Sequence, residues 1–164
     1  MTETKQSIIR LLESNAHYTT EELARLAGTD AETAKNIVKE LEETGAVIKY
    51  ATIFDNDVIE REVVEALIEV RVTPQKNRGF DAIAEDIYGF DEVKSLYLMS
   101  GGYDLAVFVE CKTLRAVSAF VSDKLSTLDT VLSTATHFIL KKYKVEGAVA
   151  HENHNENKRL AIKL

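Results

Sequence analysis

The sequence has no tryptophan, one proline and one cysteine among its 164 residues. The lone Cys111 cannot form an internal disulfide, and its position in an apolar, strand-like run favours a buried, inert thiol over a nucleophile. No window approaches the roughly 18 continuous apolar residues of a membrane span, and the polar N-terminus lacks the apolar core of a signal peptide. We therefore expect a soluble, cytoplasmic protein.

Positive charge is also scarce. The chain has 20 Lys and Arg against 27 Asp and Glu, which gives a net charge of -7. Such a molecule repels a polyanion on average, so any binding of nucleic acid must use a local surface. The hydrophobic content of 45% is enough for one ordinary core or two small ones.

The N-terminal third has the apolar spacing of helices. A first helix is indicated by Ile8, Ile9, Leu11 and Leu12, and a polar run over 14–20 ends it. A second helix begins at a capping box formed by Thr19 and Glu22, and Gly28 supplies its left-handed stop. Its expected buried residues are Leu23, Leu26 and Ala27.

A third helix follows almost at once, with a capping-box pattern at Thr29 and Glu32 and an end at Gly45. Its expected apolar face consists of Ala31, Ala34, Ile37, Val38 and Leu41. Two helices joined by a very short turn containing glycine are typical of a helix-turn-helix, and the first helix completes a three-helix DNA-binding unit. A plain helical hairpin is the alternative.

The side of the third helix opposite its apolar face would lie in the major groove of DNA. Asn36 can pair in bidentate fashion with adenine, and Thr33 can touch a thymine methyl or a phosphate. Lys35 and Lys39 can neutralise phosphates. Residues 1–50 contain six Lys or Arg and nine Asp or Glu, a net charge of -3, so a merely solvated helix face is the competing interpretation.

After the third helix, the pattern over 46–55 alternates and predicts a strand that forms a wing or leads to a second domain. The polar run over 55–62 indicates a connector between two domains. We therefore expect residues 1–60 to form a helix-turn-helix domain with a connecting strand.

From Val63 onward, strands alternate with helices. The predicted order is a strand over 63–72, a helix near 80–87, strands over 93–99 and 103–111, a helix over 114–128 capped by Thr113, and a strand over 130–144. This order is the ferredoxin-like βαββαβ pattern, an antiparallel sheet covered on one face by two helices, and the fold class is α+β. The uncovered sheet face predicts a homodimer.

Three tracts, taken in order, resemble one known family. The tract over 41–50, LEETGAVIKY, is similar to the end of the third helix and the following strand in the Lrp/AsnC transcription regulators. The tract over 100–105, SGGYDL, resembles the effector loop of that family, and the tract over 131–144 resembles its final strand. The resemblance implies a DNA-binding regulator with a helix-turn-helix, a ferredoxin-like effector-binding and oligomerisation domain over 61–146, and assembly up to an octamer.

The SGGYDL tract can also be interpreted physically. Gly101 and Gly102 can adopt the positive φ angles of a tight primed turn and leave two amides open to a carboxylate. Asp104 suits an ammonium group, and Tyr103 offers a ring edge or a hydroxyl. The alternative is a simple turn in solvent. The resemblance favours binding of a small effector, an amino acid, with further expected contacts from Leu98, Met99, Ser100, Thr134 and Thr136.

Two other function classes compete with this interpretation. A dimeric ferredoxin-like enzyme is disfavoured because His17 and His137 are isolated and no catalytic, cofactor or metal motif is present. His151 and His154 lie in a polar tail over 147–164, where weak metal binding is conceivable but a built site is not expected. A non-regulatory, architectural DNA-binding protein would bind without sequence preference.

Overall fold

The computed structural model describes residues 2–74 and 79–150. The chain divides into two compact units, Met1–Ile53 and Phe54–Leu164, and each is described by itself. Within the described residues, no helix is both long and apolar enough to cross a membrane.

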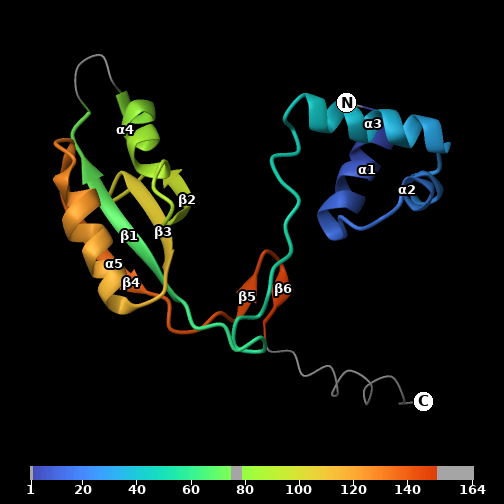
Figure 1. Cartoon of the computed structure of the whole chain (residues 1–164). Helices are drawn as coiled ribbons and strands as arrows, with labels where there is room; N and C mark the ends of the chain where they lie inside the picture. The colour runs from blue at the N-terminus through green and yellow to red at the C-terminus, as the bar shows by residue number, and fades with distance from the viewer. Residues whose placement is uncertain (1, 75–78, 151–164) are drawn as a thin grey trace. The chain divides into compact units, whose positions relative to one another are not determined.

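The first unit consists of three helices, as predicted (Figure 1). They are α1 Glu3–Ser14, α2 Thr20–Ala27 and α3 Ala31–Glu43. The predicted capping box of α2 is confirmed, because the Thr19 hydroxyl accepts from the Glu22 N–H and the Glu22 carboxylate accepts from the Thr19 N–H. Gly28 ends α2 in the left-handed conformation, with φ of 67°.

The start of α3 differs from the predicted capping box at Thr29. The N-cap is Asp30, whose Oδ1 accepts from the Thr33 N–H at 2.8 Å and whose Oδ2 accepts from the Thr33 hydroxyl at 2.6 Å. These two hydrogen bonds, the hydroxyl first, lower the pKa of Asp30. A carboxylate that accepts two hydrogen bonds at the positive end of a helix outcompetes a hydroxyl one residue earlier.

The three helices enclose a small core. It consists of Ile8, Leu23, Ala24 and Ala34, with Leu11, Leu12, Tyr18, Ala27, Ile37 and Val38 packed against them. Two predicted core positions are wrong: Leu26 is 46% exposed, and Ala31 is exposed as the first residue of α3. Ala24 is buried and Leu26 is not, because residues 23, 24 and 27 lie on the same face of α2, and this is the face that packs against the other helices.

The predicted strand over 46–55 is not formed. Residues 46–54 have no strand or helix assignment, and Ile48 is 95% exposed. A strand exists only when its backbone pairs with another strand, and no described segment pairs with this one.

The second unit has the predicted order of elements and the ferredoxin-like topology (Figure 1). The elements are β1 Val64–Val72, α4 Gly79–Tyr88, β2 Val93–Leu98, β3 Leu105–Cys111, α5 Leu114–Ala119 and β4 Val131–Phe138. The sheet order is β2-β3-β1-β4, and each neighbouring pair is antiparallel. β4 ends earlier than predicted, and a small hairpin follows, β5 Lys144–Val145 with β6 Ala148–Val149.

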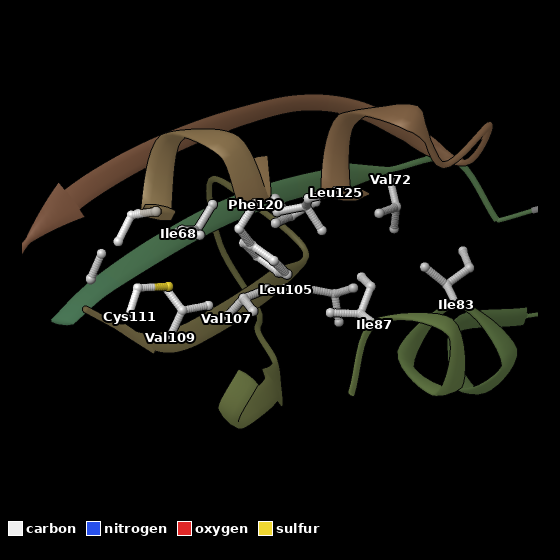
Figure 2. Close-up of a cluster of buried hydrophobic side chains, with 13 residues drawn as sticks. Ile68, Val72, Ile83, Ile87, Leu105, Val107, Val109, Cys111, Phe120 and Leu125 are labelled. Atoms are coloured by element: carbon white, nitrogen blue, oxygen red, sulfur yellow. The ribbon is translucent and has the colours of Figure 1, made fainter. Parts of the chain in front are cut away.

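One face of this sheet forms the main core with both helices (Figure 2). Alternate residues of β1 and β3 point into it, as strand geometry requires, and α4 and the α5 segment supply the other side. The buried members are Ala66, Ile68, Val70, Val72, Ile83, Ile87, Leu105, Val107, Val109, Cys111, Val117, Phe120 and Leu125. Cys111 is 8% exposed, so its predicted burial is confirmed, and burial raises the pKa of its thiol.

The last helix is not the single α-helix expected over 114–128. α5 passes into a π-helical turn, Phe120–Lys124, and then into a 3-10 turn, Leu125–Thr127. Phe120 is 2% exposed and enters the core, a position that the predicted stripe did not include, and the predicted Val121 is half-buried and packs against the same core. Leu114, expected to be buried, is 57% exposed, whereas Thr113 caps α5 as predicted.

Candidate DNA-binding helix and effector loop

The outer face of α3 presents most of the predicted DNA contacts to solvent. Lys35, Asn36 and Lys39 are exposed, and Thr33 is half-buried. The Thr33 hydroxyl already donates its hydrogen to Asp30, so toward DNA this residue offers its methyl group and the remaining lone pairs of its oxygen. The amide of Asn36 lies one helical turn from Lys39, on the same face.

Acidic residues on α3 are partly neutralised inside the unit. Lys5 of α1 donates to Glu40 at 2.7 Å, and Lys39 lies 3.5 Å from Glu43. Their charges are therefore compensated locally, which reduces the unfavourable field of a unit that carries more carboxylates than cations. The Lys39–Glu43 contact is exposed and weak, so Lys39 can exchange it for a phosphate.

A further contact ties α3 to the residues that follow it. The Tyr50 hydroxyl donates to Glu42 Oε1 at 3.0 Å. Partial burial and, second, the Glu42 carboxylate raise the pKa of Tyr50. Neither residue was singled out by sequence reasoning, because the pair depends on how the chain turns after Gly45.

The loop between β2 and β3 spans 99–104 and is longer than the predicted two-residue primed turn. Gly101 has a φ of 156°, whereas Gly102 does not have the positive φ that the turn prediction required. A Cβ at either glycine would meet nothing within 4 Å, so both backbones face open space. The hairpin itself is confirmed, with Leu98 paired to Leu105.

Asp104 makes two hydrogen bonds to β1 and a third to Met99, at the end of β2. Its N–H donates to Val70 O at 3.0 Å, its carbonyl accepts from Met99 N–H at 2.8 Å, and its Oδ2 accepts from Val72 N–H at 2.9 Å. The β1–β4 register shifts between Arg71 and Val72, which releases the Val72 amide from the regular ladder. One carboxylate oxygen is thus used inside the fold, and no partner for Oδ1 is found among the described residues.

Arg71 is a loop contact that sequence reasoning missed. Its Nε donates to Gly102 O at 2.8 Å from an exposed position on β1. The available signal was strand alternation, since Arg71 lies between the buried Val70 and Val72 and therefore belongs, with Glu65 and Glu69, to the face of β1 away from the core. Arg71 and Asp104 together attach both ends of the glycine segment to β1.

The remaining predicted ligand contacts differ in position. Leu98, Met99 and Ser100 are exposed, and Tyr103 is half-buried beside Asp104. Thr134 and Thr136 pair with Val70 and Ile68, so β1 stands between them and the loop. Two strand spacings amount to about 10 Å, and within one described unit the threonines and the loop are not brought together.

Thr136 instead borders an open groove of about 480 Å³ between β4 and the α5 segment. The lining residues are Val117, Ser118, Val121, Ser122, Ser126, Thr136 and Phe138. Hydroxyl and hydrocarbon groups line the groove, without a charged side chain.

The histidines do not form a reactive site in the described part of the chain. His137 lies on β4, 55% exposed, with Nε2 3.3 Å from Glu69 Oε1. Across residues 2–74 and 79–150, no cluster of three metal-ligating side chains is found. His151 and His154 lie outside the described residues.

Comparison with known proteins decides the family. A winged helix-turn-helix DNA-binding model matches residues 1–48, and the model of the Lrp/AsnC ligand binding domain matches residues 65–149. A Bacillus subtilis protein, the uncharacterized HTH-type transcriptional regulator YugG, is 45% identical over 99% of this chain and 98% of its own length. The chain belongs to the Lrp/AsnC family. It is accordingly a DNA-binding transcription regulator with a ligand-binding domain, and not an enzyme.

Solved structures agree with this Lrp/AsnC fold. A transcriptional regulator of Neisseria meningitidis, crystallised as an L-methionine complex, matches with a TM-score of 0.72 at 24% identity, over 94% of this chain and 99% of that one. Escherichia coli AsnC matches with a TM-score of 0.68 at 21% identity, over 88% and 95% of the two chains. A more distant sequence relative, the transcriptional regulator AzlB of Bacillus subtilis, is 25% identical over 87% of this chain and 90% of its own.

Proposed function

We propose that this Lrp/AsnC regulator binds specific DNA sequences through α3 and that a small effector, an amino acid, bound at the 99–104 loop changes its DNA affinity or its assembly. The observation that carries the proposal is the exposed outer face of a well-capped α3, on which Lys35, Asn36 and Lys39 lie together.

Each residue of this face has a distinct role toward DNA. Asn36 reads a base edge in the major groove, by preference adenine, and Thr33 contacts a thymine methyl or a phosphate. Lys35 and Lys39 bind phosphates and supply affinity that does not depend on sequence. The net charge of the unit is unfavourable, so two copies of α3 acting together are needed to gather enough phosphate contacts.

The effector loop has groups for both poles of an amino acid. The backbone at Gly101 and Gly102 has open space where a Cβ would stand, so their amides can accommodate a carboxylate, and Oδ1 of Asp104 suits an ammonium. Leu98, Met99, Ser100 and Tyr103 border the loop, and Thr134 and Thr136 would have to come from a neighbouring subunit. The L-methionine complex of the Neisseria relative supports an amino acid as the class of effector.

The protein acts as a homodimer in this proposal, with an octamer as the larger assembly, in the cytoplasm. Its sheet has a face that the two helices leave uncovered, where register places Leu67, Phe108, Ala135 and His137 beside Glu65, Glu69 and Glu110. Pairing of such faces hides apolar side chains and fixes two copies of the chain relative to each other.

In the proposed mechanism, a dimer formed by two sheet domains carries two helix-turn-helix units. Two α3 helices meet successive major grooves roughly 34 Å apart, and an effector that favours one arrangement of subunits changes how well that distance is met. A coupling free energy of about 1 to 3 kcal/mol suffices to alter promoter occupancy several-fold.

Footprinting of the DNA upstream of the gene, repeated with each amino acid, tests the proposal. Protection of defined sequences that strengthens, weakens or lengthens with one amino acid is the expected result. Protection without sequence preference would identify an architectural protein instead, and complete absence of protection at modest ionic strength would reject DNA binding by α3.

A further inference from the structure

Residues 46–53 follow α3 in the chain and lead to the second unit. Within the described residues, hydrogen bonds attach the first part of this segment to α3. Within the first unit, the Val47 N–H donates to Leu41 O at 3.0 Å, and the Tyr50 hydroxyl donates to Glu42 Oε1 at 3.0 Å. Ile48 and Ile53 are exposed, so packing adds little to this attachment. Tyr50 is thus the last residue that the described structure ties to α3.

The second unit holds the other end of this segment. Residues 55–61 form a turn in which the Ile59 N–H donates to Asp55 O at 3.2 Å and the Arg61 N–H donates to Asn56 O at 2.9 Å. Arg61 then pairs with Glu110 of β3 at 3.2 Å. Among the described residues, the hydrogen bonds and the ion pair that hold these two ends leave residues 51–54 between them, which we call the free segment.

Loss of the Tyr50 hydrogen bond would lengthen this free chain. The last attachment to α3 would then be the Val47 amide, and residues 48–50 would join the free segment. Three more residues add about 10 Å of extended reach. That length is a substantial fraction of the roughly 34 Å that separates successive major grooves on one side of DNA.

We propose that Tyr50, through its hydrogen bond to Glu42, is a positioning residue that fixes the reach of α3 and thereby selects the spacing between two DNA half-sites. The inference rests on the proposed function, in which two copies of the chain present two α3 helices. Tyr50 makes no contact with DNA in this role. A chain without the hydrogen bond binds the same half-site sequence but accepts a wider range of half-site spacings.

The chemistry of the pair suits a persistent contact. A phenol is a neutral donor near pH 7, and a carboxylate is a strong acceptor, so the bond is charge-assisted. Partial burial and the Glu42 carboxylate both favour the neutral phenol, in agreement with the raised pKa of Tyr50. A hydrogen bond of ordinary net strength changes an equilibrium by a factor of about 2 to 10.

The test measures affinity for duplexes that carry two copies of the footprinted half-site at centre-to-centre spacings of about 10, 13, 15 and 21 base pairs. The variants are Tyr50→Phe and Glu42→Ala, which remove the bond, and Glu42→Gln, which keeps an acceptor oxygen. Tyr88→Phe, at an exposed tyrosine of α4, is the matched control. Thermal unfolding of each variant checks that the three-helix unit stays folded.

We expect the wild-type protein, Glu42→Gln and Tyr88→Phe to prefer one helical phase, and Tyr50→Phe and Glu42→Ala to lower that preference by a factor of about 2 to 10. The quantity compared is the ratio of the affinities at two spacings, because a general effect of the charge change at Glu42 on DNA affinity cancels in that ratio. If folded Tyr50→Phe shows the same ratio of affinities between spacings as the wild-type protein, the role of Tyr50 is overturned and the proposed function stands. A wild-type protein that binds every spacing equally would remove both this inference and the fixed spacing of the proposed function.

Discussion

The Asp104 carboxylate accepts a hydrogen bond from the Val72 N–H at 2.9 Å, at the point where the register of β1 shifts. The residue therefore has a role in the fold as well as in the proposed effector site. A ligand can use only the carboxylate oxygen that β1 leaves open. Substitutions of Asp104 must for this reason separate loss of charge from loss of the hydrogen bond.

The paired substitutions Asp104→Asn and Asp104→Ala make that separation. Asp104→Asn keeps an acceptor oxygen for Val72, so the domain should stay near wild-type stability while the response of DNA binding to the effector is lost. Asp104→Ala should lose the response and also cost about 1 to 3 kcal/mol of unfolding free energy, because the half-buried Val72 amide loses its acceptor. Gel-shift titrations with and without effector, together with urea unfolding, measure the two effects. DNA affinity without effector should be unchanged, and an intact response in Asp104→Asn would show that the charge is not used.

Lys39→Glu should weaken DNA binding at all sequences and lower the slope of log affinity against log salt by about 1, because one phosphate contact is lost. Lys94→Glu, at an exposed lysine of β2 with the same charge change, should have a much smaller effect. Fluorescence anisotropy over a salt series measures both slopes. Equal losses in the two variants would mean that net charge, and not contact by α3, sets the affinity.

Asn36→Ala should act differently, because a base contact carries sequence information that a phosphate contact does not. We expect a loss of about 1 to 3 kcal/mol at the preferred operator and little change on unrelated DNA. Competition binding with single base-pair variants of the footprinted site locates the position that becomes tolerant. A uniform loss on all sequences would place Asn36 on the phosphate backbone instead.

The ion pair of Glu92 and Lys124 gives the second unit a pH-dependent contribution to stability. Lys124 Nζ lies 2.6 Å from Glu92 Oε1, and this hydrogen bond lowers the pKa of Glu92 below its ordinary value of 4.5, against the opposing effect of burial. Because the folded pKa is the lower one, the contribution is complete above about pH 4.5 and is lost as the pH falls through the folded pKa.

Lys124→Met should therefore cost about 1 kcal/mol at pH 7, since the lysine is partly exposed and the pair is partly screened. The cost should shrink as the pH falls below the ordinary pKa of a carboxyl group. Urea unfolding of the two proteins between pH 3 and pH 7 measures the difference, with Lys94→Met as the control. A cost that does not change with pH would assign the effect to lost packing of Lys124 over the Phe90 ring, 5.4 Å from the ring centre.

Phe120→Ala should destabilise the second unit by about 3 to 5 kcal/mol, because a fully buried ring leaves a cavity. Phe120 also makes an edge-to-face contact with Phe90, at 5.7 Å between ring centres. Phe138→Ala is the matched control and should cost clearly less, since Phe138 is 38% exposed. Urea unfolding followed by far-ultraviolet circular dichroism measures both, and equal costs would contradict the fully buried position of Phe120 in the core.

Local sequence signals determined much of the fold. The capping box at Thr19, the left-handed Gly28 and the alternation of Ile68 and Val70 depend on interactions within a few residues or within one strand. The order of strands and helices then leaves few topologies, and the ferredoxin-like arrangement is the one observed. For the same reason the exposed face of α3, with Lys35, Asn36 and Lys39, could be located before the structure was known.

Only the tertiary structure decided the features that depend on contacts between distant segments. The sequence cannot show that the register shift at Val72 leaves an amide for Asp104, that Arg71 reaches Gly102, or that β1 separates the loop from Thr134. Nor does it show that no described strand pairs with residues 46–54, while Tyr50 reaches Glu42. A local pattern states which groups are available, but the pairing of strands and the packing of helices decide which of them meet, because those contacts join residues that lie far apart along the chain.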